Sequence, residues 1–519
     1  MARHTNLDSM IPREDFAFLE SGTSQSLDTF ERIQLSSIAG DSNYLLKFLR
    51  KPDFQRETVQ WTPRQVATLI ESFLDNELIP AVILWKSSTH VFVIDGGDRL
   101  SALLAWANDD YGDGDKSLSF FKGSIPTEQK KTANVARKEV EARVGRYSSF
   151  AAAISAKEDV PSHISKARQL AFTIRGLQVQ WITGDADKAE SSFFKINTQG
   201  AVLDATEELI LRNRRKAPAI VARSVVRAAA GHNYWSKFPA DTQVSVQAFA
   251  QSIHKALFAP EFATPIKSLD LPLGGSSSSA QALALLISLA EIADGQNRTV
   301  EVFPEDPDGQ QTILLLKKLD KITQRIVGNG AGSLGLHPFV WFYTSQGRHY
   351  EPLFVATFRI IERKVRDNDS IWFKKFTMAR GVIEEILIRH KTIMTLLISA
   401  LGSKNRMSAT QTALEFIINQ SIAGATDIEI DELANILNLT SRLYKIENKP
   451  GADFSDDAKT STFLQLAMKS ALKCPICNGY IDPAKSVSYD HVVRKQDGGV
   501  GAVDNCSLTH PFCNTGVKN

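Results

Sequence analysis

Residues 474–513 read CPICNGYIDPAKSVSYDHVVRKQDGGVGAVDNCSLTHPFC, and this stretch contains all 4 cysteines of the 519-residue chain. It opens with Cys474-Pro-Ile-Cys477 and closes with His510-Pro-Phe-Cys513. Two pairs of this kind, each with two intervening residues, have the spacing of a tetrahedral zinc site. A module of roughly 60 residues has too small an apolar core to be firm alone. The spacing therefore predicts a structural Zn²⁺ that is bound by Cys474, Cys477, His510 and Cys513.

The remaining cysteine, Cys506, directly follows Asn505 and precedes the apolar Leu508. This position predicts a buried packing role for its side chain. A ligand set with Cys506 in place of His510 stays open, although its spacing is less regular. A zinc ribbon without catalytic function would also satisfy the two pairs.

The residues between and just after the two pairs are those that phosphodiester hydrolysis needs, namely metal ligands and a base that activates water. Asp490 offers a carboxylate and Asn514 an amide oxygen, and both suit Mg²⁺ or Mn²⁺. We expect His491 to take the proton from water, because its pKa suits base chemistry near neutral pH. We expect Asn505 to hold the loop and orient the imidazole.

In this order the residues resemble the HNH endonuclease family and its ββα-metal fold, with His491, Asn505 and Asn514 as an H-N-N form of the signature. The resemblance covers roughly residues 472–519. It implies an active site of Asp490, His491 and Asn514. This chain differs in having His510 where many members have a zinc cysteine, and in ending five residues after Asn514, so that the final helix is short.

A second candidate site is the turn Asp95-Gly96-Gly97-Asp98-Arg99, which follows an apolar strand at 90–94 and opens a predicted helix. Consecutive glycines let the backbone approach a ligand closely, and amides at a helix N-terminus attract phosphate. Arg99 can add charge-assisted hydrogen bonds to phosphate oxygens. Upstream, Gln55 and Arg56 form another polar pair beside apolar sequence. A turn of this kind also occurs as a plain tight connection.

The spacing of residues 52–56, Trp61, the helix up to Leu74 and the turn resembles the N-terminal domain of GmrSD-type restriction proteins, in the ParB/sulfiredoxin-like superfamily. Phe194 to Gly200 is similar to the second conserved segment of that family, although Asn197 and Gln199 could equally end a helix. The resemblance covers about residues 45–215, and a C-terminal HNH module matches the family's domain order.

The GmrSD resemblance implies binding and hydrolysis of a nucleoside triphosphate and cleavage of foreign, often modified, phage DNA. The implied nucleotide-binding residues are Gln55, Arg56, Asp95, Gly96, Gly97, Asp98 and Arg99. Gly97-Asp98 replaces the two glutamines that are usual in the family.

Composition describes an ordinary globular chain, with 43% hydrophobic and 23% charged residues and a net charge of +2. Because the net charge is near zero, a DNA-binding surface must come from local clusters such as 212–216 and 359–366. Each cluster alone is also explained as a solvated helix face. Cysteine is absent before residue 474, the N-terminus is polar, and no apolar run reaches the length of a membrane span. We therefore expect a cytoplasmic protein with reduced thiols and no membrane partner.

The apolar patterns predict an α+β multidomain chain. They predict strands at 81–85, 90–94, 177–181 and 489–493, and a helix at 63–76 with Thr62 as its N-cap. A solvated helix is expected at 127–146, and further helices at 244–258, 280–293, 312–327, 354–365 and 378–401. We expect a polar Ser-rich segment at 1–40, an α/β nucleotide-binding domain at 41–205, a helical domain at 206–449, a linker at 450–458 and the HNH domain at 459–519. Within the helical domain, Gly274-Gly275 and Ser276 to Ser279 are expected to form a flexible joint.

Taken together, the patterns predict a metal-dependent HNH DNA endonuclease with a nucleotide-binding front domain, which could assemble as a homo-oligomer. Two alternatives are a nucleotide-dependent DNA-binding regulator whose HNH module does not cut, and a nuclease that acts on RNA.

Overall fold

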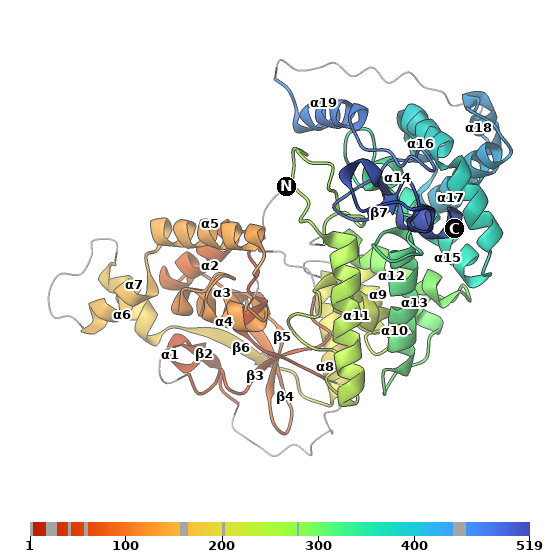
Figure 1. The fold of residues 1–519 in the computed structure, drawn as a ribbon. Helices are drawn as coiled ribbons and strands as arrows, with labels where there is room; N and C mark the ends of the chain where they lie inside the picture. The colour runs from red at the N-terminus through yellow and green to blue at the C-terminus, as the bar shows by residue number, and fades with distance from the viewer. Residues whose placement is uncertain are drawn as a thin grey trace. The chain divides into compact units, whose positions relative to one another are not determined.

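A computed structural model gives the fold of the chain (Figure 1). The structure describes residues 4–16, 29–39, 43–56, 61–123, 125–155, 164–199, 203–277, 280–439 and 453–518. The chain divides into two compact units: Met1–Arg214 with Ala230–Ser236, and Arg215–Ala229 with Lys237–Asn519. The first unit is mixed α/β and the second is mainly helical, so the α+β class is confirmed.

The first unit is built on a mixed six-stranded sheet in the order β1-β3-β5-β4-β6-β2. The strands are β1 (Arg13–Glu14), β2 (Arg32–Gln34), β3 (Leu49–Pro52), β4 (Val82–Lys86), β5 (Val91–Asp95) and β6 (Gly176–Trp181). Strands β1, β3 and β5 are parallel, and β4 pairs antiparallel with β5 and parallel with β6. Strand β2 pairs antiparallel with β6 at one edge. The strands expected at 81–85, 90–94 and 177–181 are confirmed.

Residues of the polar segment 1–40 form part of this sheet, although their sequence carries little structural signal. Arg13 of β1 pairs with Lys51, and Ile33 of β2 pairs with Leu177. Ile11 is fully buried. Strands of two or three residues are too short to show an alternating pattern, so only long-range pairing reveals them.

Helices cover both faces of the sheet. They are α1 (Leu35–Ile38), α2 (Pro63–Leu74), α3 (Gly97–Asn108), α4 (Asp115–Phe120), α5 (Thr127–Arg143), α6 (Tyr147–Ser155), α7 (Lys166–Ile174), α8 (Ala186–Gln199) and α9 (Ala205–Arg212), with a 3₁₀ turn at Asp8–Met10. Alternate residues of β5 enter two different cores. Val93 packs in the core that includes residues of α2 and α3, whereas Phe92 and Ile94 pack with Phe193 of α8.

Local sequence signals explain how two of these helices form. Thr62 is the N-cap of α2, as expected, because its hydroxyl accepts a hydrogen bond from the Gln65 amide (3.3 Å) in a capping box. The helix expected at 127–146 is present as α5, but it is not fully solvated. Ala133 and Ala136 are fully buried, and α5 packs against α2. The small alanine side chains allow this close approach despite the many charges around them.

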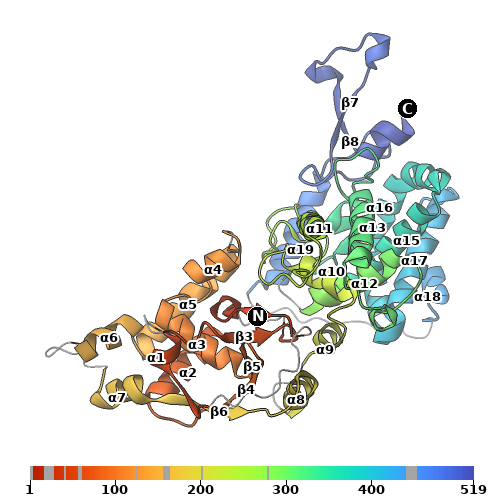
Figure 2. The same cartoon turned by 90° about the horizontal axis from the view of Figure 1, so that it is seen from below.

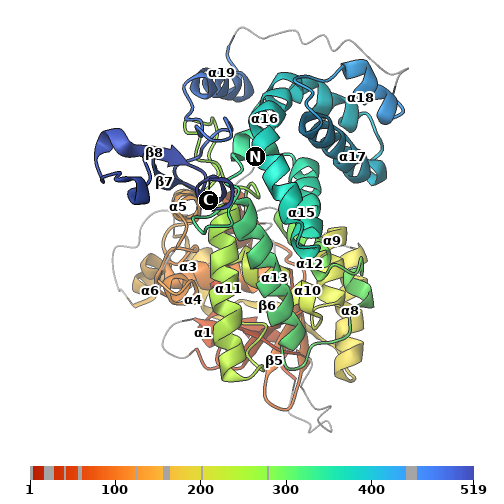
Figure 3. The same cartoon turned by 45° about the vertical axis from the view of Figure 1, so that its right-hand side comes forward.

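The second unit is mainly helical (Figure 3). Its helices are α10 (Ala217–Val226), α11 (Ala240–Phe258), α12 (Ala280–Asp294), α13 (Gln310–Ile326), α14 (Pro338–Phe342), α15 (Glu351–Arg366), α16 (Ser370–Ser399), α17 (Ser403–Ile422), α18 (Ile430–Ile436) and α19 (Asp456–Lys469), with a 3₁₀ turn at Val300–Val302. Helix α13 packs against both α11 and α15, and α16 packs against α17. The helices expected at 244–258, 280–293, 312–327, 354–365 and 378–401 are therefore confirmed. None of the described helices is both long and apolar enough to cross a membrane.

The expected flexible joint at Gly274-Gly275 is a packed turn instead. Both glycines are buried, and the Gly274 amide donates to the Leu257 carbonyl (2.7 Å). Gly275 has a φ of +72°, and a Cβ there would lie 3.0 Å from the His349 ring. Close packing and the left-handed backbone, rather than flexibility, explain these glycines. Ser278 and Ser279 lie outside the described residues, as do residues 450–452 of the expected linker.

The C-terminal part of the second unit carries a small hairpin. Strand β7 (Ser488–His491) pairs antiparallel with β8 (Cys506–Thr509), and the connecting residues include 3₁₀ turns at Lys495–Asp497 and Val503–Asn505. Figure 2 shows this hairpin projecting beyond the helices of its unit. The strand expected at 489–493 is therefore present, but it ends at His491. The short final helix that was expected after the second ligand pair is a π-helical turn at Cys513–Val517.

Candidate functional site

The four predicted zinc ligands come together in the structure. Cys474, Cys477, His510 and Cys513 are all buried, and their ligand atoms lie within 4.8 Å of one another. The first pair sits in a tight turn, in which the Cys474 amide donates to the Gly479 carbonyl (2.9 Å). Three sulfurs and one nitrogen, held this closely, form a donor set that could bind a metal such as zinc.

The His510 ring is oriented for metal binding through Nδ1. Its Nε2 lies 2.9 Å from the Tyr480 carbonyl oxygen, which accepts a hydrogen bond from Nε2–H. Its Nδ1 faces the sulfurs of Cys477 (3.3 Å) and Cys513 (3.8 Å). A carbonyl partner on one ring nitrogen leaves the lone pair on the other nitrogen free for a metal.

The protonation of the three buried thiols also fits a cation. Hydrogen bonds from Cys477 and Cys513 lower the pKa of Cys474, so its sulfur carries the first negative charge. Donating to that sulfur raises the pKa of Cys477 to about 12, and it raises the pKa of Cys513 as well. The protein alone therefore stabilises one thiolate, whereas a bound dication would stabilise all three.

Cys506 is exposed, which corrects the expected buried packing role. It lies on β8 opposite His491 and is outside the cluster. Leu508, two residues further along β8 and on the same face, packs against the cluster, whereas Cys506 begins the strand opposite His491, where this small core no longer covers it.

A buried ion pair attaches the cluster to α16. Arg380 Nε donates to Glu384 Oε1 (2.7 Å), and both side chains are almost fully buried. Glu384 also accepts from the Tyr480 amide (2.6 Å), and the Gly381 amide donates to the Cys477 carbonyl (3.0 Å). Removing one partner of a buried pair usually costs about 3–5 kcal/mol, because the other charge is left unpaired. The Cys/His cluster is therefore built into the helical unit.

His337, the N-cap of α14, lies in the same interior and gives a pH prediction. Burial lowers the pKa of His337 to about 4 from its ordinary 6.5, so the folded protein holds the ring neutral. Its stabilising contribution is present above pH 6.5 and is lost as the pH falls toward 4, because the unfolded chain then binds the proton more tightly. A pKa difference of about 2.5 corresponds to about 3 kcal/mol.

We therefore expect the free energy of unfolding, measured in urea by tryptophan fluorescence, to fall between pH 6.5 and 4. In His337→Gln this fall should be smaller by about 3 kcal/mol. An unchanged pH dependence in the variant would contradict a buried neutral ring, and NMR titration of the wild-type imidazole gives an independent check.

The candidate catalytic residues Asp490 and His491 lie at the end of β7. They line a cavity of about 300 Å³ together with Arg494, Lys495, Gln496 and Lys518. Lys518 Nζ donates to Asp490 Oδ2 (2.7 Å) and to the His491 carbonyl oxygen (2.5 Å). The position of the Lys518 ammonium group indicates that the Asp490 carboxylate attracts a cation. Three cations and a carboxylate beside an imidazole also suit a phosphate group and its metal.

Neither of the two candidate asparagines lines this cavity. Asn505 holds the hairpin loop, since it accepts from the Val493 amide (2.6 Å) and donates to the Val500 carbonyl (2.8 Å). This matches its expected role in the loop. Asn514 Nδ2 donates to Ser488 Oγ (2.8 Å). Ser488 and Asp490 are two apart on β7, so their side chains share a face, and Asn514 lies on that face too.

The predicted nucleotide-binding turn has the expected backbone. Gly96 has a φ of +89°, and α3 begins at Gly97. Arg99 Nη2 donates to Asp95 Oδ2 (2.6 Å) and to the Ala81 carbonyl (3.0 Å), so both charged ends of the turn are tied to the protein. Asp98 is exposed at the first turn of α3.

The upstream pair lies against the same turn and against the second conserved segment. Gln55 Nε2 donates to the Val93 carbonyl (2.5 Å), and a Cβ on Gly97 would lie 3.2 Å from Gln55 Oε1. Arg56 Nη2 donates to Asn197 Oδ1 (2.8 Å). The structure thus brings segments 52–56, 95–99 and 194–199 together, while Gly200 lies outside the described residues.

The sequence reasoning missed Lys51, Arg494 and Lys495. Lys51 is buried beside the turn, where burial lowers the pKa of its amine while Asp8 and Asp98 oppose that effect. Arg494 and Lys495 line the cavity at His491. A lysine in an apolar strand was the only signal for Lys51, and lysine and arginine in a polar loop give no specific signal.

Most side chains of the two basic clusters are used within the protein. In the first cluster, Arg212 pairs with Glu208 (2.7 Å) and Arg214 with Asp53 (3.0 Å). In the second, Arg363 pairs with Glu415 (3.0 Å), Lys364 with Asp369 (2.7 Å) and Arg366 with Glu362 (3.0 Å). These ion pairs favour the explanation that each cluster is a solvated or structural helix face rather than a surface that binds DNA strongly.

In a comparison with known families, residues 35–215 match the N-terminal domain of the GmrSD restriction endonuclease. The predicted resemblance of the front of the chain is therefore confirmed. The match suggests a restriction endonuclease family, and hence a nuclease. No curated protein and no solved structure matches the chain.

Proposed function

We propose that the chain is a metal-dependent DNA endonuclease of HNH type with a nucleotide-binding front domain that restricts foreign or modified phage DNA. The observation that carries this proposal is the cavity at the end of β7, where Asp490 and His491 meet Lys518 and Arg494. It lies on the hairpin that the buried Cys/His cluster supports. The match of residues 35–215 supports the same class of protein.

In this proposal the Cys/His cluster holds a structural Zn²⁺ and keeps the hairpin in shape. Asp490 and Asn514 would hold a Mg²⁺ or Mn²⁺ ion, which neutralises charge on the scissile phosphate when it is bound. Asn514 contacts Ser488, which shares a face of β7 with Asp490, and Lys518 already places a positive charge against Asp490. The donor set, one carboxylate and one amide oxygen, suits a hard cation.

His491 acts as the base that takes a proton from the attacking water. It lies next to the proposed metal ligand and lines the same cavity, and its surroundings leave it partly accessible to solvent. Arg494 and Lys495 orient the DNA strand by contacting phosphate oxygens. Asn505 keeps the loop closed through its bonds to Val493 and Val500, so that these cations stay at the rim.

The front domain binds a nucleoside triphosphate at the turn 95–99. The amides at the start of α3 bind phosphate, and Gln55, Arg56 and Arg99 line the same region. Asp98 is exposed there, so it could hold the Mg²⁺ that accompanies a triphosphate, while Lys51 limits its repulsion of phosphate. We propose that hydrolysis at this site gates cleavage.

The experiment that tests the proposal incubates the protein with modified and with unmodified phage DNA, with Mg²⁺ or Mn²⁺, with and without each triphosphate. Metal-dependent cleavage that responds to a triphosphate is the expected result. Binding without cleavage would favour a DNA-binding regulator instead, and cleavage of RNA alone would change the substrate class.

A further inference from the structure

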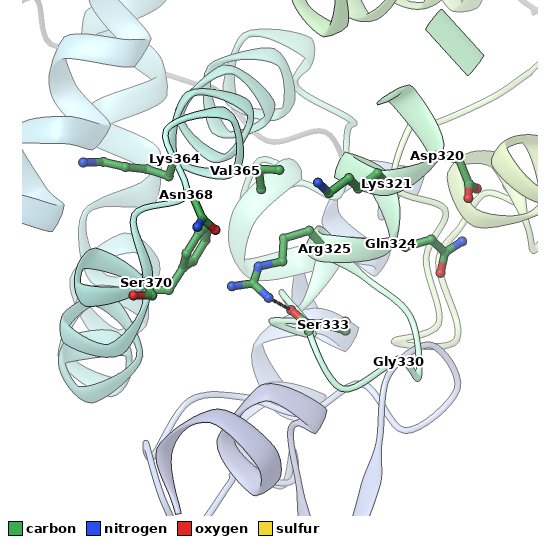
Figure 4. Close-up of a pocket in the computed structure, with 12 residues that line it drawn as sticks. Asp320, Lys321, Gln324, Arg325, Gly330, Ser333, Lys364, Val365, Asn368 and Ser370 are labelled. Carbon is green, nitrogen blue, oxygen red and sulfur yellow. Dashed lines mark hydrogen bonds between the residues drawn. The ribbon is translucent and has the colours of Figure 1, made fainter. Parts of the chain in front are cut away.

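A cavity in the helical unit lies where the helices meet the hairpin module, and no residue of it belongs to the sites described above. It measures about 400 Å³ and is lined by residues of α13, of the loop 328–333 and of the junction between α15 and α16. Figure 4 shows Arg325 near its centre, with Lys321 from the same helix close by.

The loop that lines the cavity is also the seat of the Cys/His module. The Phe512 amide donates to the Ser333 carbonyl (2.9 Å), and Thr515 Oγ1 donates to the Ala331 carbonyl (2.7 Å). The Val487 amide, just before β7, donates to Asn329 Oδ1 (3.0 Å). A ligand in this cavity therefore binds next to the elements that position the proposed nuclease residues.

Arg325 is a half-buried cation without a carboxylate partner among the described residues. Its Nη1 donates to the Gly332 carbonyl (2.6 Å), while its Nε is buried and has no hydrogen-bond partner. The guanidinium contacts the rings of Phe373 and Phe512, at 4.0 and 4.7 Å from their centroids. Burial lowers the pKa of Arg325, and no neighbouring acid opposes that effect. A charge that is partly removed from water is stabilised by an opposite charge, so this position favours a bound anion.

The other charges around the cavity leave it net positive. Asp320 accepts a hydrogen bond from Ser252 Oγ (2.8 Å), and Figure 4 shows it directed away from Arg325. Lys364 is neutralised by Asp369 (2.7 Å). Lys321 is exposed and has no ion-pair partner among the residues described. Ser370, the first residue of α16, also lines the cavity, but the positive end of this helix is already capped by Asp369, which accepts from the Trp372 amide (2.9 Å).

We propose that this cavity binds a phosphate group of the DNA strand, through Arg325 and Lys321, and so fixes the strand relative to the hairpin. The inference rests on the proposed function for the identity of the ligand. A free nucleotide offers the same phosphate chemistry, and the experiment below separates the two sources. The aromatic rings hold the guanidinium plane in place, so that it can form paired hydrogen bonds to phosphate oxygens.

The test measures binding of a fluorescein-labelled DNA duplex by fluorescence anisotropy from low to high NaCl. The full-length protein carries His491→Ala, so that no cleavage occurs. Arg325→Gln and Lys321→Gln should each weaken binding several-fold and reduce the slope of log Kd against log salt by about 0.9, the value for one lost phosphate contact. Lys317→Gln is the matched control, because Lys317 is exposed one turn away on α13 and does not line the cavity.

A second pair of variants tests the cavity without removing any charge. A Cβ at Gly332 would lie 2.7 Å from Arg325 Nη1, whereas a Cβ at Gly330 meets nothing within 4 Å. Gly332→Ala should therefore weaken DNA binding as Arg325→Gln does, and Gly330→Ala should leave it unchanged.

Three outcomes decide the proposal. Weaker DNA binding in Arg325→Gln, Lys321→Gln and Gly332→Ala alone supports a DNA phosphate site, even if the wild-type protein then proves unable to cut DNA. If the same variants lose only binding of a free triphosphate, measured by calorimetry without DNA, the phosphate site stands and its ligand is a nucleotide. Equal effects from Lys317→Gln, or no effect from any variant, overturn the site.

Discussion

His491→Ala should abolish DNA cleavage while the protein stays folded. A positioned general base contributes about 10² to 10⁴-fold to a hydrolysis rate, so the initial rate of plasmid cleavage should fall by at least that factor. Stability should hardly change, because the His491 side chain lines an open cavity and supports no core. Zinc content and thermal unfolding, measured alongside, should match the wild-type protein.

The control for this variant is His390→Ala. His390 lies on α16 in the same unit, where it pairs with Asp427 (2.9 Å) outside the cavity at β7. Its loss removes an imidazole without touching the proposed site, and cleavage should persist. Full cleavage by His491→Ala would refute His491 as the base and leave the hairpin with a DNA-binding role at most.

Cys474→Ser should lose the bound zinc and unfold the C-terminal module. Structural zinc contributes on the order of 10–16 kcal/mol in small zinc-dependent peptides, far more than a hairpin of two short strands can supply. Cleavage sites for a protease should therefore open within the last part of the chain, from about residue 470 onward. Metal analysis and limited proteolysis with mass spectrometry measure both effects.

Cys506→Ser provides a matched control within the same module. Cys506 is exposed and outside the cluster, so its replacement should leave zinc and protease resistance unchanged. Loss of zinc from Cys506→Ser, with retention in His510→Ala, would instead support the alternative ligand set. The effect of Cys474→Ser should also reach α16, because Arg380 and Glu384 are buried against the turn that contains Cys477.

The ligand spacing in the sequence was enough to predict the Cys/His cluster. In each of the two pairs, Cys474/Cys477 and His510/Cys513, only two residues separate the ligands, so each pair is close in space whatever lies between the pairs. Cys506 shows the limit of that reasoning. The nearby apolar Leu508 indicated a buried side chain, but the pairing register of the hairpin places Cys506 opposite His491, at the start of β8, where the core around the cluster does not cover it. Register depends on pairing with β7, which no local pattern reveals.

In the front domain too, local signals predict some elements, whereas contacts between distant residues decide others. The apolar runs at 81–85 and 90–94 and the capping box at Thr62 are local signals, and the structure confirms each of them. The contact between Arg56 and Asn197 joins residues far apart in the chain, and the pairing of β1 and β2 into the sheet is equally non-local. Short strands gain their stability from neighbours and not from their own composition.

The sequence alone determined those strands, helices and ligand pairs that depend on interactions between residues close in the chain. Helix caps, hydrophobic periodicity and the spacing within each ligand pair are all local signals of this kind. Only the tertiary structure decided which charges remain available to a ligand. Most of the arginines in the two basic clusters form ion pairs, whereas Arg325, which lies in neither cluster, is half-buried and has no carboxylate partner within the described part of the chain. Charge is read from the sequence, but its neutralisation depends on partners that only folding brings within a few ångströms.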